Sequence, residues 1–484
     1  MKAVSILGTS SNAGKSWVAT ALCAWLRQRG VKVAPFKAQN MANNAFATLT
    51  GGEIGVAQAV QAEACGLTPR VEMNPILLKP NGRDGAQIVR LGVAGETSTA
   101  RDYYRTIEEN WATVRDTLDG WKSECDVLVL EGAGSPVELN LMDRDIVNLR
   151  PVEYLDGRWL LVSNIEYGGV FAQIFGTWSL LPEPMQPRGL GVAVNRFRGD
   201  LSLFKGAKAE INSRIELPYL GVLPFDSRWA IDDEDSLNAC SERPRGDVPH
   251  IAWIKYPRIS NSQDQFPWKN DEGVQCVWTE SAAIVRGAAA VVLPGSKNTL
   301  EDLKWLKEHG LAEAVKGLAK AGGAVVGICG GKQMLGNKLL DPATGESAVG
   351  LGLLPIRTEF CETKRVVRNE AKFKGRVWET FEIHTGESWL EGGAVSETLL
   401  LTRKAGEGEF KRDGIRCGKV WGSYQHGLFD APELRQLLAD QAGIRDVKIC
   451  KMDWKAKRAL VYDRMADALD RYLDLDTVKR YLGL

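Results

Sequence analysis

The amino-acid sequence predicts an α/β protein with two successive domains, and three observations support this. The chain has 484 residues, which is too long for a single hydrophobic core. Short β-branched runs alternate with longer helical patterns, as in parallel sheets that are covered on both faces. A polar stretch containing proline and glycine, residues 241–249, separates the two halves and is typical of a domain linker.

The first domain, residues 1–240, is expected to contain a doubly wound parallel sheet. Its apolar runs are separated by helical stretches such as residues 57–65 and 103–118. The predicted strands are residues 3–7, 31–36, 126–130, 159–162 and 190–195. The domain is expected to end near the acidic run Asp232–Asp235, which precedes the linker.

The second domain, residues 248–442, is expected to be another α/β unit. Its predicted strands begin at Ile251 and continue at residues 289–293, 324–328 and 381–384. Residues 443–484 are expected to form a helical segment that packs on this second domain. The evidence for a helix is that apolar residues in the range 461–473 lie three and four positions apart.

The amino-acid composition limits the kinds of molecule that this protein is expected to bind. Lys plus Arg and Asp plus Glu each number 61, so no basic excess argues for nucleic acid. The nine cysteines form no C-x-x-C pair or Cys/His ligand spacing, which fits a reducing compartment. No apolar stretch approaches the roughly 18 residues that a membrane helix needs. We therefore expect a cytoplasmic protein that acts on small molecules without a membrane or nucleic-acid partner; a homo-oligomer is compatible with the sequence.

A phosphate-binding loop follows the first predicted strand. Residues 8–16 read Gly-Thr-Ser-Ser-Asn-Ala-Gly-Lys-Ser and lead into an apolar-periodic helix. In such loops, backbone N–H groups and the helix N-terminus surround a polyphosphate, lysine adds a charge, and serine can bind magnesium. The usual pattern has four residues between the first glycine and the Gly-Lys pair, and this chain has five. The strand and helix on either side still favour nucleotide binding.

Polar residues at neighbouring strand ends are expected to complete this site, because ligands of doubly wound sheets bind beyond the carboxyl ends of strands. Lys37 closes the predicted strand 31–36 and would offset charge on a transferred phosphoryl group. Glu131 closes strand 126–130, and Glu53 lies just before a predicted helix. We predict ATP and Mg²⁺ as cofactors. The predicted nucleotide-binding residues are Gly8, Thr9, Asn12, Gly14, Lys15, Ser16 and Lys37, and the predicted metal ligands are Ser16, Glu53 and Glu131.

One thiol in the second domain has the surroundings of a nucleophile. Cys329 lies in Val-Val-Gly-Ile-Cys-Gly-Gly, residues 325–331, where an apolar strand ends in glycines and a helix-like stretch begins. A tight strand-to-helix corner exposes the sulfur, and the helix N-terminus favours the thiolate. The N–H groups of Gly295 and Gly330 are predicted to hold an oxyanion. We expect the other cysteines to be small apolar core residues.

A histidine is needed as the base for this thiol, and the chain has only four. His426 fits best, because an apolar segment meets glycine there and places the imidazole at the same sheet edge as Cys329. His384 is the alternative. His309 is expected on a helix surface and His250 in the linker.

These motifs resemble the cobyric acid synthase family, the glutamine-dependent amidotransferases of cobalamin biosynthesis, over essentially the whole chain. The matching segments include residues 8–16, 36–41, 52–55, 73–80, 131–136, 145–148, 168–172, 195–200, 293–299, 327–331, 382–384 and 424–427. The resemblance implies a dethiobiotin-synthetase-like P-loop domain followed by a class I glutamine amidotransferase domain, with Cys329 and His426 at the family's nucleophile and histidine. It also implies glutamine as the nitrogen donor and a corrinoid substrate, adenosylcobyrinic acid a,c-diamide, amidated at its b, d, e and g carboxylates.

The chain departs from the family pattern at three places. Class I glutaminases commonly have a glutamate two residues after the histidine, where this chain has Leu428, which leaves open whether a third residue assists the pair. Asn164 and Tyr167 stand where the family generally has aspartate and arginine. Residues 259–264, Ile-Ser-Asn-Ser-Gln-Asp, resemble the segment that opens the glutaminase domain, and no role is assigned to the stretch after them.

Two other functions remain open from the sequence. A related ligase could use the same ammonia source on a cell-wall carboxylate or on another tetrapyrrole, since only the substrate cavity separates these options. A nucleotide-dependent switch ATPase shares the P-loop but has no use for an exposed thiol and a strand-end histidine. Among the polar residues, the amides of Gln39-Asn40 and Asn43-Asn44 are expected to face the substrate.

Overall fold

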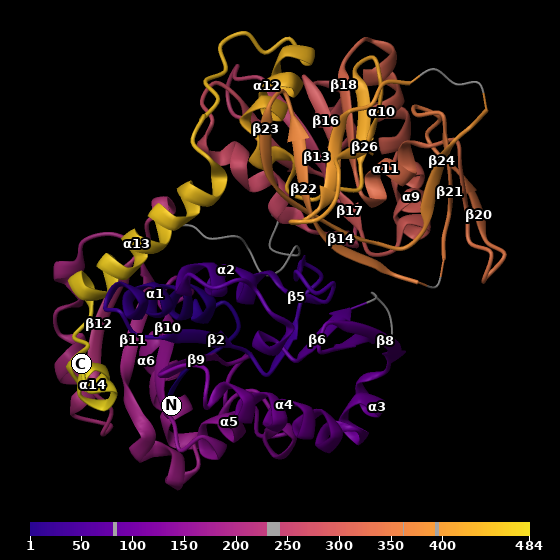
Figure 1. Ribbon diagram of the computed structural model, residues 1–484. Coiled ribbons are helices and arrows are strands. Elements are labelled where there is room, and N and C mark those ends of the chain that lie inside the picture. The colour runs from indigo at the N-terminus through magenta and orange to yellow at the C-terminus, as the bar shows by residue number, and fades with distance from the viewer. Residues whose placement is uncertain (81–84, 230–242, 362, 393–395) are drawn as a thin grey trace.

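A computed structural model describes residues 1–80, 85–229, 243–361, 363–392 and 396–484. Figure 1 shows two α/β lobes, the first in indigo and magenta and the second in orange, with a yellow helix running between them. The predicted acidic run Asp232–Asp235 lies outside the described residues. Within the described ranges, no helix combines the length and the apolar character that crossing a membrane requires.

The first domain is built on a six-stranded sheet in the order β12-β11-β10-β1-β9-β2, and every pairing in it is parallel. The strands are β1 (Lys2–Gly8), β2 (Val33–Phe36), β9 (Val127–Glu131), β10 (Arg158–Asn164), β11 (Gly189–Phe197) and β12 (Tyr219–Pro224). The predicted doubly wound sheet is therefore confirmed. Because β1 lies between β9 and β10, the loop that follows it emerges beside the carboxyl end of β9.

Alternating side chains of these strands face two helical layers. Val4 and Ile6 of β1 belong to one apolar cluster with α1 and α2, whereas Ala3 and Leu7 face the opposite side. The helices are α1 (Lys15–Gln28), α2 (Val56–Cys65), α3 (Ala100–Arg105), α4 (Ile107–Trp121), α5 (Leu149–Tyr154), α6 (Val170–Leu180) and α7 (Ala207–Asn212).

A smaller layer of strands extends the first domain toward the second (Figure 1). Strands β4 and β5 pair as an antiparallel hairpin, and the other four form a sheet in the order β3-β6-β7-β8. These strands are β3 (Gln39–Met41), β4 (Ala45–Ala47), β5 (Glu53–Gly55), β6 (Ile76–Pro80), β7 (Ala86–Arg90) and β8 (Val93–Ser98). The β4–β5 hairpin leads directly into α2, so it connects the interdomain surface to the main sheet.

The second domain also has a six-stranded sheet, in the order β15-β13-β16-β18-β28-β27, in which only the edge strand β27 is antiparallel. Its strands are β13 (His250–Ile254), β15 (Gln275–Thr279), β16 (Ala290–Leu293), β18 (Ala324–Ile328), β27 (Ile415–Cys417) and β28 (Val420–Ser423). The helices that accompany it are α8 (Ala282–Arg286), α9 (Thr299–Glu308), α10 (Leu311–Lys320), α11 (Gly330–Leu335) and α12 (Pro432–Gln441).

Antiparallel strands are added to this second sheet. One set has the order β20-β19-β21-β24 and another β23-β22-β25-β26, while β14 pairs with β17. Their bounds are β14 (Ile259–Ser260), β17 (Gly295–Ser296), β19 (Lys338–Leu340), β20 (Ser347–Val349), β21 (Ile356–Glu359), β22 (Arg365–Phe373), β23 (Arg376–His384), β24 (Glu387–Leu390), β25 (Leu400–Lys404) and β26 (Lys411–Asp413). Residues 381–384 thus form a strand as predicted, but in an antiparallel sheet outside the central one.

The C-terminal segment corrects a prediction. Residues 443–450 remain on the second domain, where the Cys450 N–H donates to Asp271 at 2.8 Å. Helices α13 (Trp454–Tyr472) and α14 (Asp476–Leu482), however, pack on the first domain, which Figure 1 shows beside α1. The expectation that the whole segment packs on the second domain is therefore wrong.

The reason for this packing is an apolar face that completes the helical layer over the first sheet. Tyr462, Met465 and Leu469 of α13 are buried in the same cluster as the apolar residues of α1. Polar contacts fix the direction of the helix: the Trp25 indole N–H donates to Asp470 at 2.8 Å, and Arg29 pairs with that carboxylate at 2.6 Å. The chain therefore returns to the domain in which it began.

Candidate active sites

Cys329 occupies a strained corner between β18 and α11. Its backbone has φ 51° and ψ −112°, a positive φ that side-chain-bearing residues rarely adopt. The glycines around it allow close approach of two elements, since a Cβ on Gly331 would lie 1.9 Å from the Leu293 carbonyl oxygen. The Cys329 N–H donates to the Ser423 carbonyl oxygen at 2.8 Å, which ties the corner to β28. This is the strand-to-helix geometry that sequence reasoning predicted for a nucleophile.

The Cys329 thiol lines a cavity of about 350 Å³, which is large enough for a small amino acid. The other polar side chains of the wall come from β17, the loop between β17 and α9, the start of α9, helix α11 and the end of β23. They include Ser296, Lys297, Asn298, Thr299, Gln333 and His384. The sulfur is thus accessible to a ligand, although the residue is 3% exposed.

His426 follows β28 and is fully buried beside this thiol. Its backbone pairs with Phe381 of β23, and the two rings stack with centroids 5.2 Å apart. The Nδ1 atom lies 2.7 Å from the Asp264 carboxylate, which also accepts the Gly427 N–H at 2.7 Å. The histidine is therefore held by a carboxylate on one nitrogen, which is the arrangement of a nucleophile, base and orienting acid.

The pKa of His426 reflects these neighbours. Burial by itself lowers the pKa, but the Asp264 carboxylate and the hydrogen bond with the Cys329 thiol outweigh burial and raise it to about 10. The His426 imidazole is therefore a stronger base than an ordinary histidine and is suited to take the proton of the Cys329 thiol.

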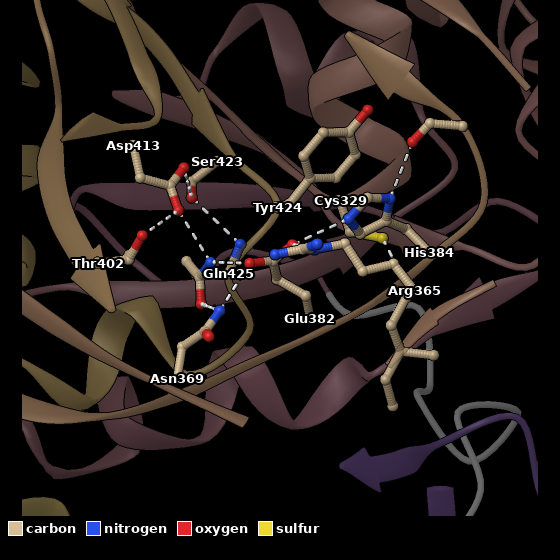
Figure 2. A network of polar contacts seen from close by, with 12 residues as sticks. Cys329, Arg365, Asn369, Glu382, His384, Thr402, Asp413, Ser423, Tyr424 and Gln425 are labelled. Carbon is tan, nitrogen blue, oxygen red and sulfur yellow. Dashed lines mark hydrogen bonds and ion pairs between the residues drawn. The ribbon is translucent and has the colours of Figure 1, made fainter. Parts of the chain in front are cut away.

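His384, the alternative base, lies in the same cavity but belongs to a different network. Figure 2 shows it close to the Cys329 thiol, together with Glu382 and Arg365. Its Nε2 is 3.1 Å from Glu382 and its Nδ1 is 3.0 Å from the Gly386 carbonyl oxygen, so both ring nitrogens face acceptors. Despite burial, the hydrogen bond from His384 and the charge of Arg365 lower the pKa of Glu382 to about 2. Because both nitrogens are engaged, His384 is poorly suited to accept a proton from Cys329.

The predicted oxyanion donors lie at the same corner. A Cβ on Gly295 would stand 3.0 Å from His426 Cε1, and one on Gly330 would stand 2.9 Å from the backbone nitrogen of Ser296. Both glycines therefore lie close to the thiol and the imidazole. Their role in holding an oxyanion stays a prediction.

In the first domain, the phosphate-binding loop has the backbone of an anion cradle. Asn12 and Gly14 adopt positive φ values of 60° and 96°, and α1 begins at Lys15. The loop is fixed from the neighbouring strands, since Asn195 donates to the Ala13 carbonyl oxygen at 3.0 Å and the Thr9 N–H donates to the Val162 carbonyl oxygen at 3.0 Å.

Lys15 folds back over this loop. Its Nζ donates to the carbonyl oxygens of Ser10 and Gly134, each at 2.9 Å. A Cβ on Gly8 would lie 2.9 Å from that Nζ, so glycine is needed for the lysine to reach this position. Two carbonyl oxygens hold the ammonium group where a polyphosphate could replace them.

Glu131 is the centre of the polar cluster next to the loop. One of its carboxylate oxygens accepts hydrogen bonds from Ser16 Oγ and Lys37 Nζ, each at 2.9 Å, and the other accepts one from Gln61 of α2. Ser16 and Glu131 therefore fit a magnesium ion that a bound triphosphate would share, because both are hard oxygen donors at the end of the loop. Lys37 lies where its charge would face a phosphoryl group.

Glu53 does not join this cluster. Its fully buried carboxylate pairs with Lys79 at 2.7 Å and with Lys364 of the second domain at 2.6 Å. Burial alone would raise its pKa, but the two lysines lower it well below the ordinary value. The structure therefore contradicts the prediction of Glu53 as a metal ligand, because two lysines already occupy its oxygens and make it part of the domain interface.

The structure shows where the residues of two departures from the family pattern lie. Leu428 is fully buried in the core, so no carboxylate reaches His426 from that position, and Asp264 provides it instead. Asn164 supports the phosphate loop by donating to the Asn12 carbonyl oxygen at 3.2 Å. Tyr167 is exposed.

Sequence reasoning missed two residues, Asp264 and Asn261. Both lie in the segment 259–264, whose polar residues were the only signal, and His426 is more than 160 positions away. Asn44 was expected to face the substrate, but its amide instead exchanges hydrogen bonds with Ser262 across the domain interface, at 3.0 and 3.2 Å.

Comparison with known proteins agrees with this geometry. Residues 4–237 match the CobQ/CobB/MinD/ParA nucleotide binding domain, and residues 250–434 match the CobB/CobQ-like glutamine amidotransferase domain. A cobyric acid synthase from Thermodesulfovibrio yellowstonii is 38% identical, with both chains covered completely. The chain belongs to the cobyric acid synthase family. Members from Variovorax paradoxus and Desulforudis audaxviator are each 40% identical, with 98% and 99% of both chains covered. It is thus a glutamine-dependent amidoligase of cobalamin biosynthesis with a nucleotide-binding domain and a glutaminase domain.

Proposed function

We propose that this protein converts adenosylcobyrinic acid a,c-diamide to adenosylcobyric acid by amidating the b, d, e and g carboxylates, with glutamine as nitrogen donor and ATP as the activating substrate. The observation that carries the proposal is the presence of two complementary centres in one chain. One domain holds a thiol, an imidazole and a carboxylate in contact, and the other holds a P-loop lysine beside Ser16 and Glu131. Family membership supplies the corrinoid substrate.

The glutaminase centre releases ammonia from glutamine in two steps. The Cys329 thiolate attacks the side-chain amide carbon, and His426 donates its proton to the departing nitrogen, so that ammonia leaves and a thioester remains. Water then hydrolyses the thioester, giving glutamate and returning the proton to the Cys329–His426 pair. Asp264 keeps Nδ1 protonated throughout, and the N–H groups of Gly295 and Gly330 would stabilise the negative oxygen of each tetrahedral intermediate.

The nucleotide centre makes a carboxylate reactive. A carboxylate is a poor electrophile, and transfer of the γ-phosphoryl group of ATP to it gives an acyl phosphate that ammonia can displace. Lys15 and Lys37 would offset the charge of the transferred group. Ser16 and Glu131 would hold magnesium, which supplies further neutralisation of the phosphate charge when it is bound.

The same residues would serve a ligase that acts on a cell-wall carboxylate or another tetrapyrrole, so the test must identify the product. The purified protein is incubated with ATP, glutamine and each candidate acid, and the products are examined by mass spectrometry for replacement of a carboxyl OH by NH₂. Conversion of the corrinoid through its successive amides is the expected result. ATP turnover without any such change in mass would contradict the proposal and favour a switch ATPase.

Two variants assign the reactions to their domains. Cys329→Ser is expected to lose amidation with glutamine but to keep it with an ammonium salt, because only the nitrogen source is removed. Lys15→Ala is expected to lose both, because the carboxylate is no longer activated. Retained use of glutamine by the serine variant would remove Cys329 from the role of nucleophile.

A further inference from the structure

Asn261 touches the glutaminase histidine and the other domain with one side-chain amide. It follows β14, is buried, and has a positive φ of 57°. Its Nδ2 lies 2.9 Å from His426 Nε2, and its Oδ1 accepts the backbone N–H of Ala45, in β4 of the nucleotide-binding domain, at 3.0 Å. Gln263 also donates to that oxygen, at the longer distance of 3.3 Å.

The contact with Ala45 determines which end of the amide faces the histidine. A backbone N–H can only donate, so it requires the carbonyl oxygen of Asn261 on its side. The NH₂ group must then point at His426 Nε2, and that nitrogen must accept the hydrogen bond with its lone pair. Because Asp264 already holds Nδ1, the docked amide favours the neutral imidazole with its proton on Nδ1, and so opposes the protonation that the Asp264 carboxylate favours.

This places Asn261 in competition with the nucleophile. Nε2 is the ring nitrogen left for Cys329, and its single lone pair can accept either the thiol proton or the Asn261 N–H. While the amide occupies Nε2, the histidine cannot take the proton from sulfur. If Ala45 moves away, the amide can turn and present its oxygen, which is compatible with a protonated ring.

We propose that Asn261 is a positioning residue that restrains His426 while the β4–β5 hairpin is docked, and releases it when the nucleotide-binding domain moves that hairpin. This proposal rests on the proposed function. It adds a link between the two domains, through which ammonia release depends on carboxylate activation. Glutamine hydrolysis would then be slow until the nucleotide-binding domain has activated a carboxylate that the ammonia can attack.

The hairpin is suited to this role because it reaches both centres. On the glutaminase side, the Phe46 ring lies 5.0 Å from Phe381, whose ring stacks on His426. On the other side, β5 leads directly into α2, and Gln61 of that helix donates to Glu131 at the nucleotide loop. A displacement of α2 when nucleotide and acceptor bind would therefore move the strand that holds Asn261.

Removing one N–H from the nucleotide-binding domain tests the link without changing the glutaminase domain. In Ala45→Pro, the donor to Asn261 is lost, and Ala45→Gly is the matched control that keeps it. Glutamate release is measured with glutamine alone and again with ATP and the acceptor, together with the ratio of glutamate to amide formed. Amidation with an ammonium salt is measured in parallel to report the state of the nucleotide centre.

We expect Ala45→Pro to release glutamate without ATP roughly five- to tenfold faster than Ala45→Gly, the effect of one lost hydrogen bond. Its ratio of glutamate to amide should rise, while ammonia-driven amidation stays near that of the control. Asn261→Ala should show the same gain, and the double variant should be no faster than Asn261→Ala alone, because both changes break one link. A purely structural role would lower the rate.

Three outcomes would overturn the link. These are an unchanged basal rate in both Ala45→Pro and Asn261→Ala, a slower rate in Asn261→Ala, or additive effects in the double variant. If Ala45→Pro does not fold, the Asn261→Ala measurement alone decides by its sign. A wild-type protein that makes no amide even from ammonia would instead refute the proposed function, and the link with it.

Discussion

Replacing Asp264 with asparagine tests the part of the glutaminase centre that only the structure revealed. Asparagine keeps the shape of the side chain but removes the charge that opposes the effect of burial on His426. With Asp264 and the thiol in place, the His426 pKa is about 10, against an ordinary value of 6.5. That difference corresponds to a factor of ~10³ in the transfer of a proton from sulfur to imidazole, or about 5 kcal/mol.

Part of this effect comes from the thiol itself, so we expect kcat/KM for glutamine to fall by ~10²–10³ in Asp264→Asn. Amidation with an ammonium salt should stay close to the wild-type rate, because the nucleotide centre is untouched. The His426 pKa is raised in the folded state, so its contribution to stability is fully present below pH 6.5 and is lost as the pH rises through about 10.

The rate at which iodoacetamide alkylates Cys329 reports the fraction of the residue present as thiolate, because only the thiolate reacts. In the variant, only the thiol still opposes the effect of burial on the imidazole pKa, so the rise of the alkylation rate should move to more alkaline pH. Asp271→Asn is a matched control: this buried carboxylate contacts Arg435 at 2.7 Å and the Cys450 N–H at 2.8 Å, and so belongs to a different ion pair of the same domain. The control should lower thermal stability without moving the alkylation profile. Glutamine use within about threefold of wild type in Asp264→Asn, with the same profile, would refute the reasoning.

Other parts of the structure give further expectations. Glu53→Gln removes the carboxylate partner of Lys79 and Lys364 and should cost about 3–5 kcal/mol of stability. Because the pKa of Lys79 is already lowered to about 8, this lysine is mostly uncharged at pH 9. In thermal denaturation, the loss of stability relative to wild type should therefore be smaller at pH 9 than at pH 7. Gly14→Ala forces a Cβ to 1.9 Å from Asn195 Nδ2 at a φ of 96°, so ATP affinity in a titration should fall by about tenfold or more, with glutamine hydrolysis retained. Deletion of residues 454–484 uncovers an apolar face, so calorimetry should show selective loss of stability in the nucleotide-binding domain.

The features that were predictable from the sequence are those whose chemistry lies within one continuous segment. The corner at Cys329 and the loop before Lys15 each contain a strand end, glycines and a helix start, and local geometry leaves few alternatives for such a segment. The parallel sheet was predictable for a related reason, because buried strands carry apolar side chains on both faces.

The features that were not predictable depend on contacts between distant segments. Glu53 has the position of a metal ligand at a strand end, yet Lys364, 311 residues further along the chain, decides its partner. The apolar stripe of α13 predicted a helix but carried no information about which domain it covers. Asp264 was hidden in the same way, because no spacing rule relates a carboxylate at the start of a domain to a histidine near its end.

The position of Asp264 in the chain bears on how the activity of His426 is controlled. A glutamate two residues after His426 would share its loop and would hold the imidazole whatever the other domain did. Here the acid lies three residues after Asn261, on the segment whose Ser262 exchanges two hydrogen bonds with Asn44 of the nucleotide-binding domain. Both ring nitrogens of His426 are therefore contacted by one segment, residues 259–264, which also forms part of the domain interface. A shift of that interface would change the orientation and protonation of the base together, which a carboxylate at position 428, buried in the core, could not provide.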